Sequence, residues 1–151
     1  MSFMEYQFDK FTFKVKKSLL YHEDGCWVEI DDQIARVGVN DFFQISNGDV
    51  AFVSLFAPNI NVKQGESLGD IETMKVAFEL TSPVTGEIVE KNKELDEHPE
   101  LVNSDPYEAG WMLKIKTSNL DGDLKNLLSA EQYFELMKKK VDEESSRIGK
   151  E

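Results

Sequence analysis

Apolar and polar residues alternate in the first part of the chain. Phe11, Phe13 and Val15 are each separated by one polar residue, the two-residue period of a strand with one buried face. Further along, the apolar-rich segments Trp27–Ile30 and Ile34–Val39 flank a short polar turn. Two such segments joined by a turn predict a pair of antiparallel strands.

The middle of the chain continues with short apolar runs separated by turn residues. Val50–Phe56 is the most apolar run and predicts a well-buried strand. Gly65–Glu66 and Gly69–Asp70 have the residue types of turns. After them, Ile71–Thr73 and Ala77–Leu80 are spaced to pair as a hairpin.

Two more strands and one helix complete the pattern. Glu87–Glu90 and Trp111–Lys116 predict strands, and the first of them follows the Pro- and Gly-containing turn Ser82–Gly86. Ser129–Gln132 has the spacing of a capping box, and apolar residues then recur at helical spacing as far as Val141. Many short strands followed by one helix predict a mainly β domain, a barrel or a sandwich.

Composition limits the chemistry that this domain can perform. The 151 residues include 29 Asp and Glu against 17 Lys and Arg, a formal net charge of −12, which disfavours nucleic acid and anionic membranes as partners. One cysteine and two histidines exclude an intrachain disulfide and a histidine- or cysteine-rich metal site. No apolar run reaches the length of a signal peptide or a membrane span. We expect a cytoplasmic protein with no metal and no catalytic residues of its own.

Lys75 is the candidate functional residue. If Ile71–Thr73 and Ala77–Leu80 form a hairpin, Lys75 lies at its tip, where an amine is accessible on a rigid support. From spacing alone two interpretations stay open. Lys75 is either an ordinary solvated turn lysine, as is common in turns, or the attachment point of a covalent group.

A resemblance favours the second interpretation. Segments 72–76 (ETMKV) and 82–89 (SPVTGEIV) resemble the attachment hairpin of lipoyl and biotinyl domains. The longer ordered run from Asn92 to Trp111, with NKEL, PELVN, DPY and GW in that order, resembles the glycine cleavage system H protein family. The similarity spans residues 21–140, and a match of that length is much more specific than a short motif.

The resemblance implies a fold and a site. The implied fold is a lipoyl/biotinyl-type barrel-sandwich hybrid with a C-terminal helix and small helical additions. Residues 1–18 would be an N-terminal extension, 19–141 the carrier domain and 142–151 a polar tail. Lipoate would be attached covalently to Lys75. Glu72 and Glu79, which flank Lys75 in the sequence, would be recognised by a ligase or a partner, or would simply be solvated carboxylates of the hairpin.

The resemblance also implies partners. A lipoate ligase or lipoyl transferase would modify Lys75. The carrier, which is not an enzyme, would shuttle an aminomethyl group between glycine decarboxylase and aminomethyltransferase, and dihydrolipoyl dehydrogenase would reoxidise it. The protein would supply positioning and the cofactor the chemistry.

The chain departs from the family pattern at several places, two of which bear on its function. Gly25-Cys26-Trp27 stands where the family has His-Glu-Trp, and the lysine follows Met74 and precedes Val76 rather than a Val and an Ala. Two alternatives therefore stay open. One is an H-protein-like lipoate-binding protein that carries sulfur intermediates for a heterodisulfide-reductase-like complex. The other is a biotinyl protein or a purely structural relative.

Overall fold

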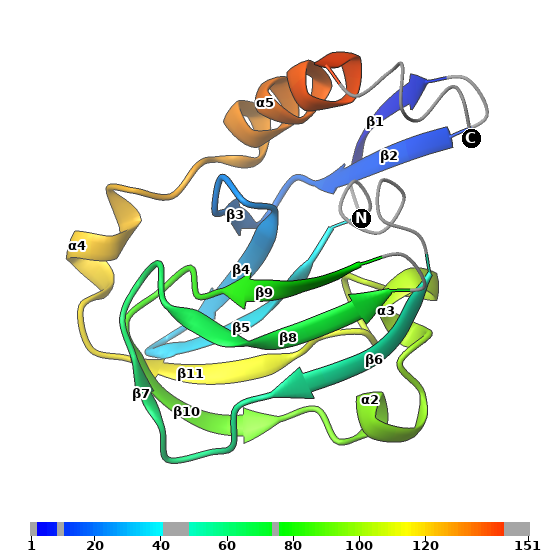
Figure 1. Ribbon diagram of the computed structural model, residues 1–151. Helices are drawn as coiled ribbons and strands as arrows, with labels where there is room; N and C mark the ends of the chain where they lie inside the picture. The colour runs from blue at the N-terminus through cyan, green and yellow to red at the C-terminus, as the bar shows by residue number, and fades with distance from the viewer. Residues whose placement is uncertain (1–2, 9–10, 41–48, 74–75, 144–151) are drawn as a thin grey trace.

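The computed structural model describes residues 3–8, 11–40, 49–73 and 76–143 (Figure 1). Its strands are β1 Phe3–Phe8, β2 Phe11–Lys16, β3 Leu20–Tyr21, β4 Cys26–Asp31, β5 Ile34–Val39, β6 Val50–Leu55, β7 Asn61–Val62, β8 Ser67–Thr73, β9 Ala77–Thr81, β10 Gly86–Lys91 and β11 Leu113–Thr117. Its helices are α2 Glu94–Glu97, α3 Leu101–Ser104, α4 Leu120–Leu124 and α5 Ala130–Glu143.

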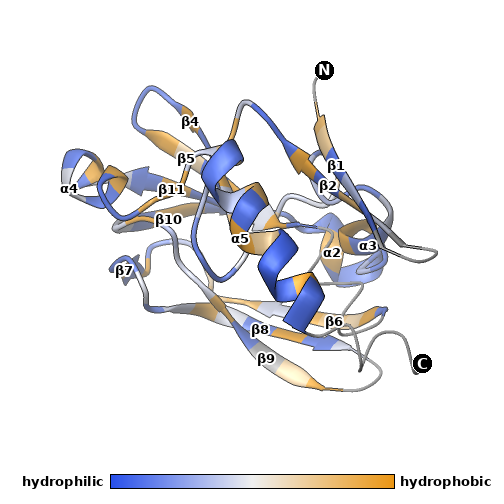
Figure 2. Cartoon of the chain, turned by 90° about the horizontal axis from the view of Figure 1, so that it is seen from above, coloured by the Kyte–Doolittle hydropathy of each residue, from blue (hydrophilic) through white to orange (hydrophobic). Residues whose placement is uncertain are grey.

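The strands form three antiparallel sheets. The largest has the order β3-β4-β5-β11-β10-β7, a second has the order β6-β8-β9, and β1 and β2 form a separate two-stranded ribbon. The six-stranded and three-stranded sheets face each other in both views (Figures 1 and 2). This arrangement confirms the predicted mainly β barrel-sandwich with a C-terminal helix and short helical additions.

One hydrophobic core fills the space between the two larger sheets. It combines Val37 of β5, Ile71 of β8 and Ile115 of β11, each of which is fully buried. Because alternate residues of a strand point to opposite faces, their sequence neighbours lie on the outer faces. The two layers are therefore held together mainly by apolar side chains contributed from both sheets.

A second core lies between the β1–β2 ribbon and α5. Phe13 and Val15 of β2 pack in one cluster with Tyr133 and Met137 of α5, and all four are fully buried. The Tyr6 hydroxyl donates a 2.8 Å hydrogen bond to Asp142 at the end of the helix. Strands β1 and β2 are thus packed against the C-terminal helix.

The start of α5 has the predicted capping box. The Gln132 amide donates to Ser129 Oγ at 3.1 Å, and the Ser129 amide donates to Gln132 Oε1 at 2.9 Å. These two bonds satisfy amide groups that have no partner within the helix. Tyr133, Met137 and Val141 then lie on its buried face, four residues apart as helical periodicity requires.

Two local predictions were wrong. The segment Val50–Phe56 is not a well-buried strand, because Phe52 is 66% exposed and Ser54 is exposed as well. Only alternate residues of β6 face the core. Gly69 and Asp70 do not form a turn but lie within β8, where the pairing with β9 shifts register between Ser67 and Gly69.

Candidate functional site

The hairpin formed by β8 and β9 is the candidate site. The predicted hairpin is present, and Glu72 pairs with Ala77 in it. Beyond them, the Thr73 amide donates to the Val76 carbonyl at 2.8 Å, and the Val76 amide donates to Thr73 Oγ1 at 3.1 Å. Chain continuity leaves two residues between Thr73 and Val76, one of which is Lys75. Lys75 itself lies outside the described residues, so its role stays a prediction.

The two predicted recognition residues lie on one face of this hairpin. Glu72 of β8 and Glu79 of β9 are both exposed, and Asp70 is directly opposite Glu79. Ile71, between the two acids of β8, points the other way and is fully buried. The hairpin thus brings Glu72 and Glu79 together with a third carboxylate, Asp70.

Sequence reasoning missed two members of this face, Asp70 and Phe52. Asp70 was placed in a turn, and Phe52 was placed in a buried strand. The alternation around Ile71 was the available signal, because if Ile71 is buried its neighbours must point outward. The register of β6 against β8, which puts Phe52 opposite Glu72, cannot be read from a single segment.

A glycine fixes how the hairpin is paired with β6. Gly69 of β8 is opposite Leu55 and has a φ of +134°, a conformation that residues with a Cβ rarely adopt. A Cβ at this position would collide with the carbonyl oxygen of Ser54. Close approach of the two backbones therefore requires glycine here.

At the end of the hairpin far from Lys75, a buried carboxylate accepts hydrogen bonds that hold the following turn. Asp123 of α4 is 3% exposed and accepts a 2.6 Å hydrogen bond from the Thr85 amide and a 3.2 Å bond from the Thr85 hydroxyl. The Gly65 amide donates to the Ser82 carbonyl at 2.9 Å. These bonds hold the turn after β9. Asp123 had no sequence signal, since it lies in a polar segment without a motif.

Cys26 is a packing residue in this structure. Its side chain is 2% exposed, and it is a free cysteine. Burial in apolar surroundings raises the pKa of the Cys26 thiol strongly, with a small opposing effect from a hydrogen bond with Gly38. A protonated, buried thiol is a poor nucleophile and a poor redox centre.

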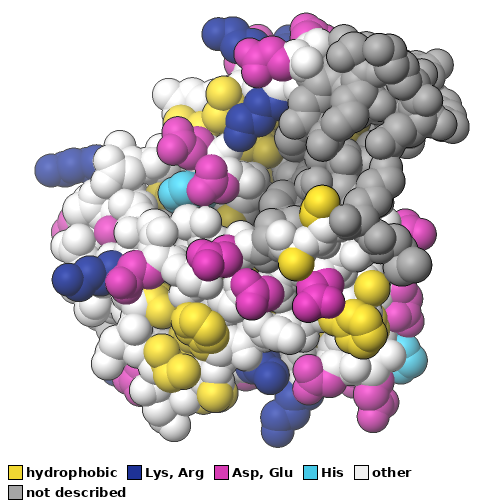
Figure 3. Space-filling model, in the orientation of Figure 1, with side chains coloured by type: hydrophobic (Ala, Val, Ile, Leu, Met, Phe, Trp, Pro, Cys, Tyr) yellow, Lys and Arg dark blue, Asp and Glu magenta, His cyan; other side chains and the backbone are white. Residues whose placement is uncertain are grey.

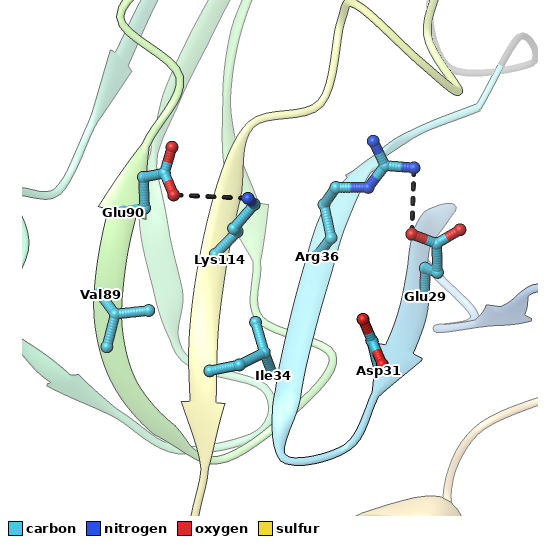
Figure 4. A pocket seen from close by; sticks show the side chains of 7 residues that line it. All are labelled: Glu29, Asp31, Ile34, Arg36, Val89, Glu90 and Lys114. Carbon is cyan, nitrogen blue, oxygen red and sulfur yellow. Dashed lines mark ion pairs between the residues drawn. The ribbon is translucent and has the colours of Figure 1, made fainter.

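A shallow cavity of about 580 Å³ lies over the outer face of the six-stranded sheet. Its charged residues form a row in which Lys114 Nζ lies 3.4 Å from Glu90 Oε1 and Arg36 Nη2 lies 3.1 Å from Glu29 Oε1 (Figure 4). Both cations thus already have a carboxylate partner. The charges of this face are largely compensated within the protein.

Within the described ranges, no group of three or more His, Cys, Asp or Glu residues is placed to hold a metal ion. The same ranges contain no helix that is both long and apolar enough to cross a membrane.

Comparison with known proteins adds independent information. The family model described as glycine cleavage H-protein matches residues 19–140. A glycine cleavage system H protein of Carboxydothermus hydrogenoformans is 42% identical over 123 residues, which cover 82% of this chain and 94% of that protein. A probable glycine cleavage system H protein of Pyrococcus abyssi is 42% identical over 127 residues, covering 83% and 94%.

A solved structure of the same family has a similar fold. The crystal structure of a glycine cleavage system H protein from Mycobacterium marinum superposes with a TM-score of 0.70 at 30% sequence identity. The alignment covers 79% of this chain and 95% of that one. Residues 1–18 lie outside the region matched by the family model.

Proposed function

The chain belongs to the glycine cleavage H-protein family, and on this premise we propose that it is a non-catalytic carrier of lipoate attached to Lys75. The observation that carries the proposal is the closure of the β8–β9 hairpin. Thr73 and Val76 are hydrogen-bonded to each other, so the connection that contains Lys75 is two residues long. A short connection on a rigid hairpin is a suitable support for an accessible amine.

The surroundings of the hairpin fit a covalent lipoyl group. Val76 is 47% exposed, and Glu72 and Ala77 beside the connection are exposed as well. Attachment would form an amide between Lys75 Nζ and the lipoyl carbonyl carbon, with loss of a lysine proton and of the leaving group that the attaching enzyme provides. Glu72 and Glu79 would contribute to recognition. When bound, the lipoyl group supplies reversible dithiol–disulfide chemistry and group transfer.

The partners would be those of glycine cleavage, namely glycine decarboxylase, aminomethyltransferase and dihydrolipoyl dehydrogenase. The net charge of −12 supports such a role, because charge complementarity gives fast association without a large permanent interface. A tethered group also has a high local concentration at whichever partner is docked. We place this work in the cytoplasm.

Intact-mass analysis tests the attachment site. The chain is incubated with lipoate, ATP and a lipoate ligase, and it is compared with Lys75→Arg and with Lys63→Arg, which alters another exposed lysine of the same region. We expect one lipoyl group on the wild type and on Lys63→Arg and none on Lys75→Arg. A wild-type chain that takes up no lipoate, or a Lys75→Arg chain that does, would overturn the proposal.

A second candidate function is a lipoyl carrier of sulfur intermediates for a heterodisulfide-reductase-like complex. It is favoured by Gly25-Cys26, which stands where the family pattern has His-Glu and therefore leaves no carboxylate at position 26. Exchange of bicarbonate into glycine, measured with glycine decarboxylase and the lipoylated chain, separates the two. Exchange above a control without the chain supports glycine cleavage, and its absence would reject the glycine-cleavage role.

A further inference from the structure

The outer face of the three-stranded sheet carries an unusually exposed aromatic side chain. We call this the Phe52 face. It consists of the outward-pointing residues of β6, β8 and β9, which the strand register places in two rows: Phe52, Glu72 and Ala77 in one, and Ser54, Asp70 and Glu79 in the other. Phe52 is 66% exposed. The small side chains of Ser54 and Ala77 do not cover its ring.

Among the residues that the structure describes, no cation compensates the charge of the Phe52 face. β6, β8 and β9 contain no Lys or Arg, and among the described residues none of Asp70, Glu72 and Glu79 takes part in an ion pair. Figure 3 shows acidic side chains in a row across the three-stranded sheet, with hydrophobic side chains toward its β6 side. The outer face of the six-stranded sheet differs, because there Glu29 is paired with Arg36 and Glu90 with Lys114 (Figure 4).

Neither feature contributes to folding. Asp70 and Glu79 are directly opposite each other on neighbouring strands, and like charges in this position destabilise a sheet. An aromatic ring on an outer sheet face buries little apolar surface in the isolated protein. Both features become favourable when a cationic surface with an apolar pocket covers this face, because aromatic anchors surrounded by complementary charge are typical of protein interfaces.

We propose that the Phe52 face is the docking surface for the enzyme that attaches lipoate to Lys75, and that this enzyme presents an apolar pocket for Phe52 surrounded by Lys or Arg residues. The inference rests on the proposed function. It extends recognition from Glu72 and Glu79, which flank the lysine in sequence, to Phe52 and Asp70, which only the fold brings to the same face.

The distance over which each partner acts indicates which of them binds the Phe52 face. Enzymes that use the loaded carrier can be reached by the lipoyl arm. The attaching enzyme must bring its reactive carbonyl to the Lys75 amine itself, before any arm exists. It must therefore contact the residues beside the two-residue connection, and the Phe52 face begins there, at Glu72 and Ala77.

Lipoylation kinetics test the proposal with matched controls. The full chain is the substrate of a lipoate ligase with ATP and lipoate, and KM for the chain and kcat are measured at several salt concentrations. Phe52→Ser is compared with Val89→Ser, since Val89 is a 40% exposed apolar residue of the six-stranded sheet. Asp70→Asn is compared with Asp121→Asn, since Asp121 is exposed on α4. Affinity for the unmodified Lys75→Ala chain is measured in parallel.

We expect Phe52→Ser to raise KM and weaken binding by about tenfold or more, as loss of an anchor residue does, with kcat little changed. Asp70→Asn should weaken binding by a few-fold and make it less dependent on salt, because exposed charges are screened by ions. Val89→Ser and Asp121→Asn should behave as wild type. Thermal unfolding checks that each variant is folded.

Three results would overturn the inference. The first is a KM for Phe52→Ser within about twofold of the wild-type KM, while the wild type itself is lipoylated normally. This result would leave the proposed function intact. The second is an equal defect in Val89→Ser. The third is a dimer of the wild type that Phe52→Ser dissociates, which would assign the face to a second copy of the chain. If the wild type takes up no lipoate, the proposed function fails and this inference fails with it.

Discussion

Gly69→Ala is expected to destabilise the protein far more than Gly65→Ala. Both glycines have a positive φ, +134° at Gly69 and +93° at Gly65. Their surroundings differ. A Cβ at Gly65 would meet nothing within 4 Å, whereas a Cβ at Gly69 would collide with the backbone of β6 at Ser54 and Leu55. The pair of variants therefore separates the cost of the backbone conformation from the cost of the collision.

The magnitudes follow from these two costs. An L-residue held at positive φ costs about 1–2 kcal/mol, and the lower entropy of the unfolded Ala chain returns about 0.4–1 kcal/mol. Gly65→Ala should therefore cost about 1 kcal/mol. Steric overlap in a packed site adds about 1–3 kcal/mol, and the upper end applies where the neighbour is backbone. Gly69→Ala should cost about 3–5 kcal/mol, which corresponds to a fall in Tm of roughly 6–20 °C.

Urea unfolding followed by tryptophan fluorescence, to which the fully buried Trp27 contributes, gives both free energies of unfolding. Calorimetry gives the two Tm values. We also expect the Gly69→Ala chain to be lipoylated more slowly than the wild type, because the hairpin is paired to β6 through this residue. Equal destabilisation by the two substitutions would refute the close approach of β6 and β8 at Gly69.

Three further predictions concern burial. Phe13→Ala should lower the free energy of unfolding by about 3–5 kcal/mol, because Phe13 is fully buried between the ribbon and α5. Phe52→Ala should leave the free energy of unfolding nearly unchanged, because Phe52 is exposed. Urea unfolding measures both values. Asp123→Ala should cost about 1–3 kcal/mol, since the Thr85 amide loses its acceptor, and Asp121→Ala, measured by the same method, should cost under about 0.5 kcal/mol. A thiol-specific disulfide reagent at pH 8 should leave native Cys26 unlabelled, because burial raises the pKa of its thiol and keeps it protonated, and should label it fully in urea. Rapid labelling of the native chain would contradict its burial.

The parts of the fold that depend on local pattern were predictable. The β8–β9 hairpin and the capping box of α5 each follow from residues close in sequence, and the structure confirms both. A hairpin needs only matched periodicity on its two sides, and a cap needs only the right residue types three positions apart.

The parts that depend on distant pairing were not predictable. Alternation identified β2 as a strand, but nothing in it indicated that Phe13 packs on α5, more than a hundred positions later in the chain. The run Val50–Phe56 was predicted to be well buried because an apolar sequence does not reveal which face lacks a covering layer. The exposure of Phe52 follows from its position on the outer face of the three-stranded sheet, in one row with the exposed Glu72 and Ala77. For the same reason, the Phe52 face could be recognised only in the assembled structure.

Peptide mapping after lipoylation identifies the lysine that carries the lipoyl group. Trypsin cleaves after lysine, and Lys63, Lys75 and Lys91 are successive lysines in this region, with no arginine between them. An acylated Lys75 blocks the middle cleavage. The account predicts that lipoylation converts the separate peptides 64–75 and 76–91 into one peptide of residues 64–91 that carries a single lipoyl group. Recovery of both short peptides from a chain that carries lipoate elsewhere would contradict it.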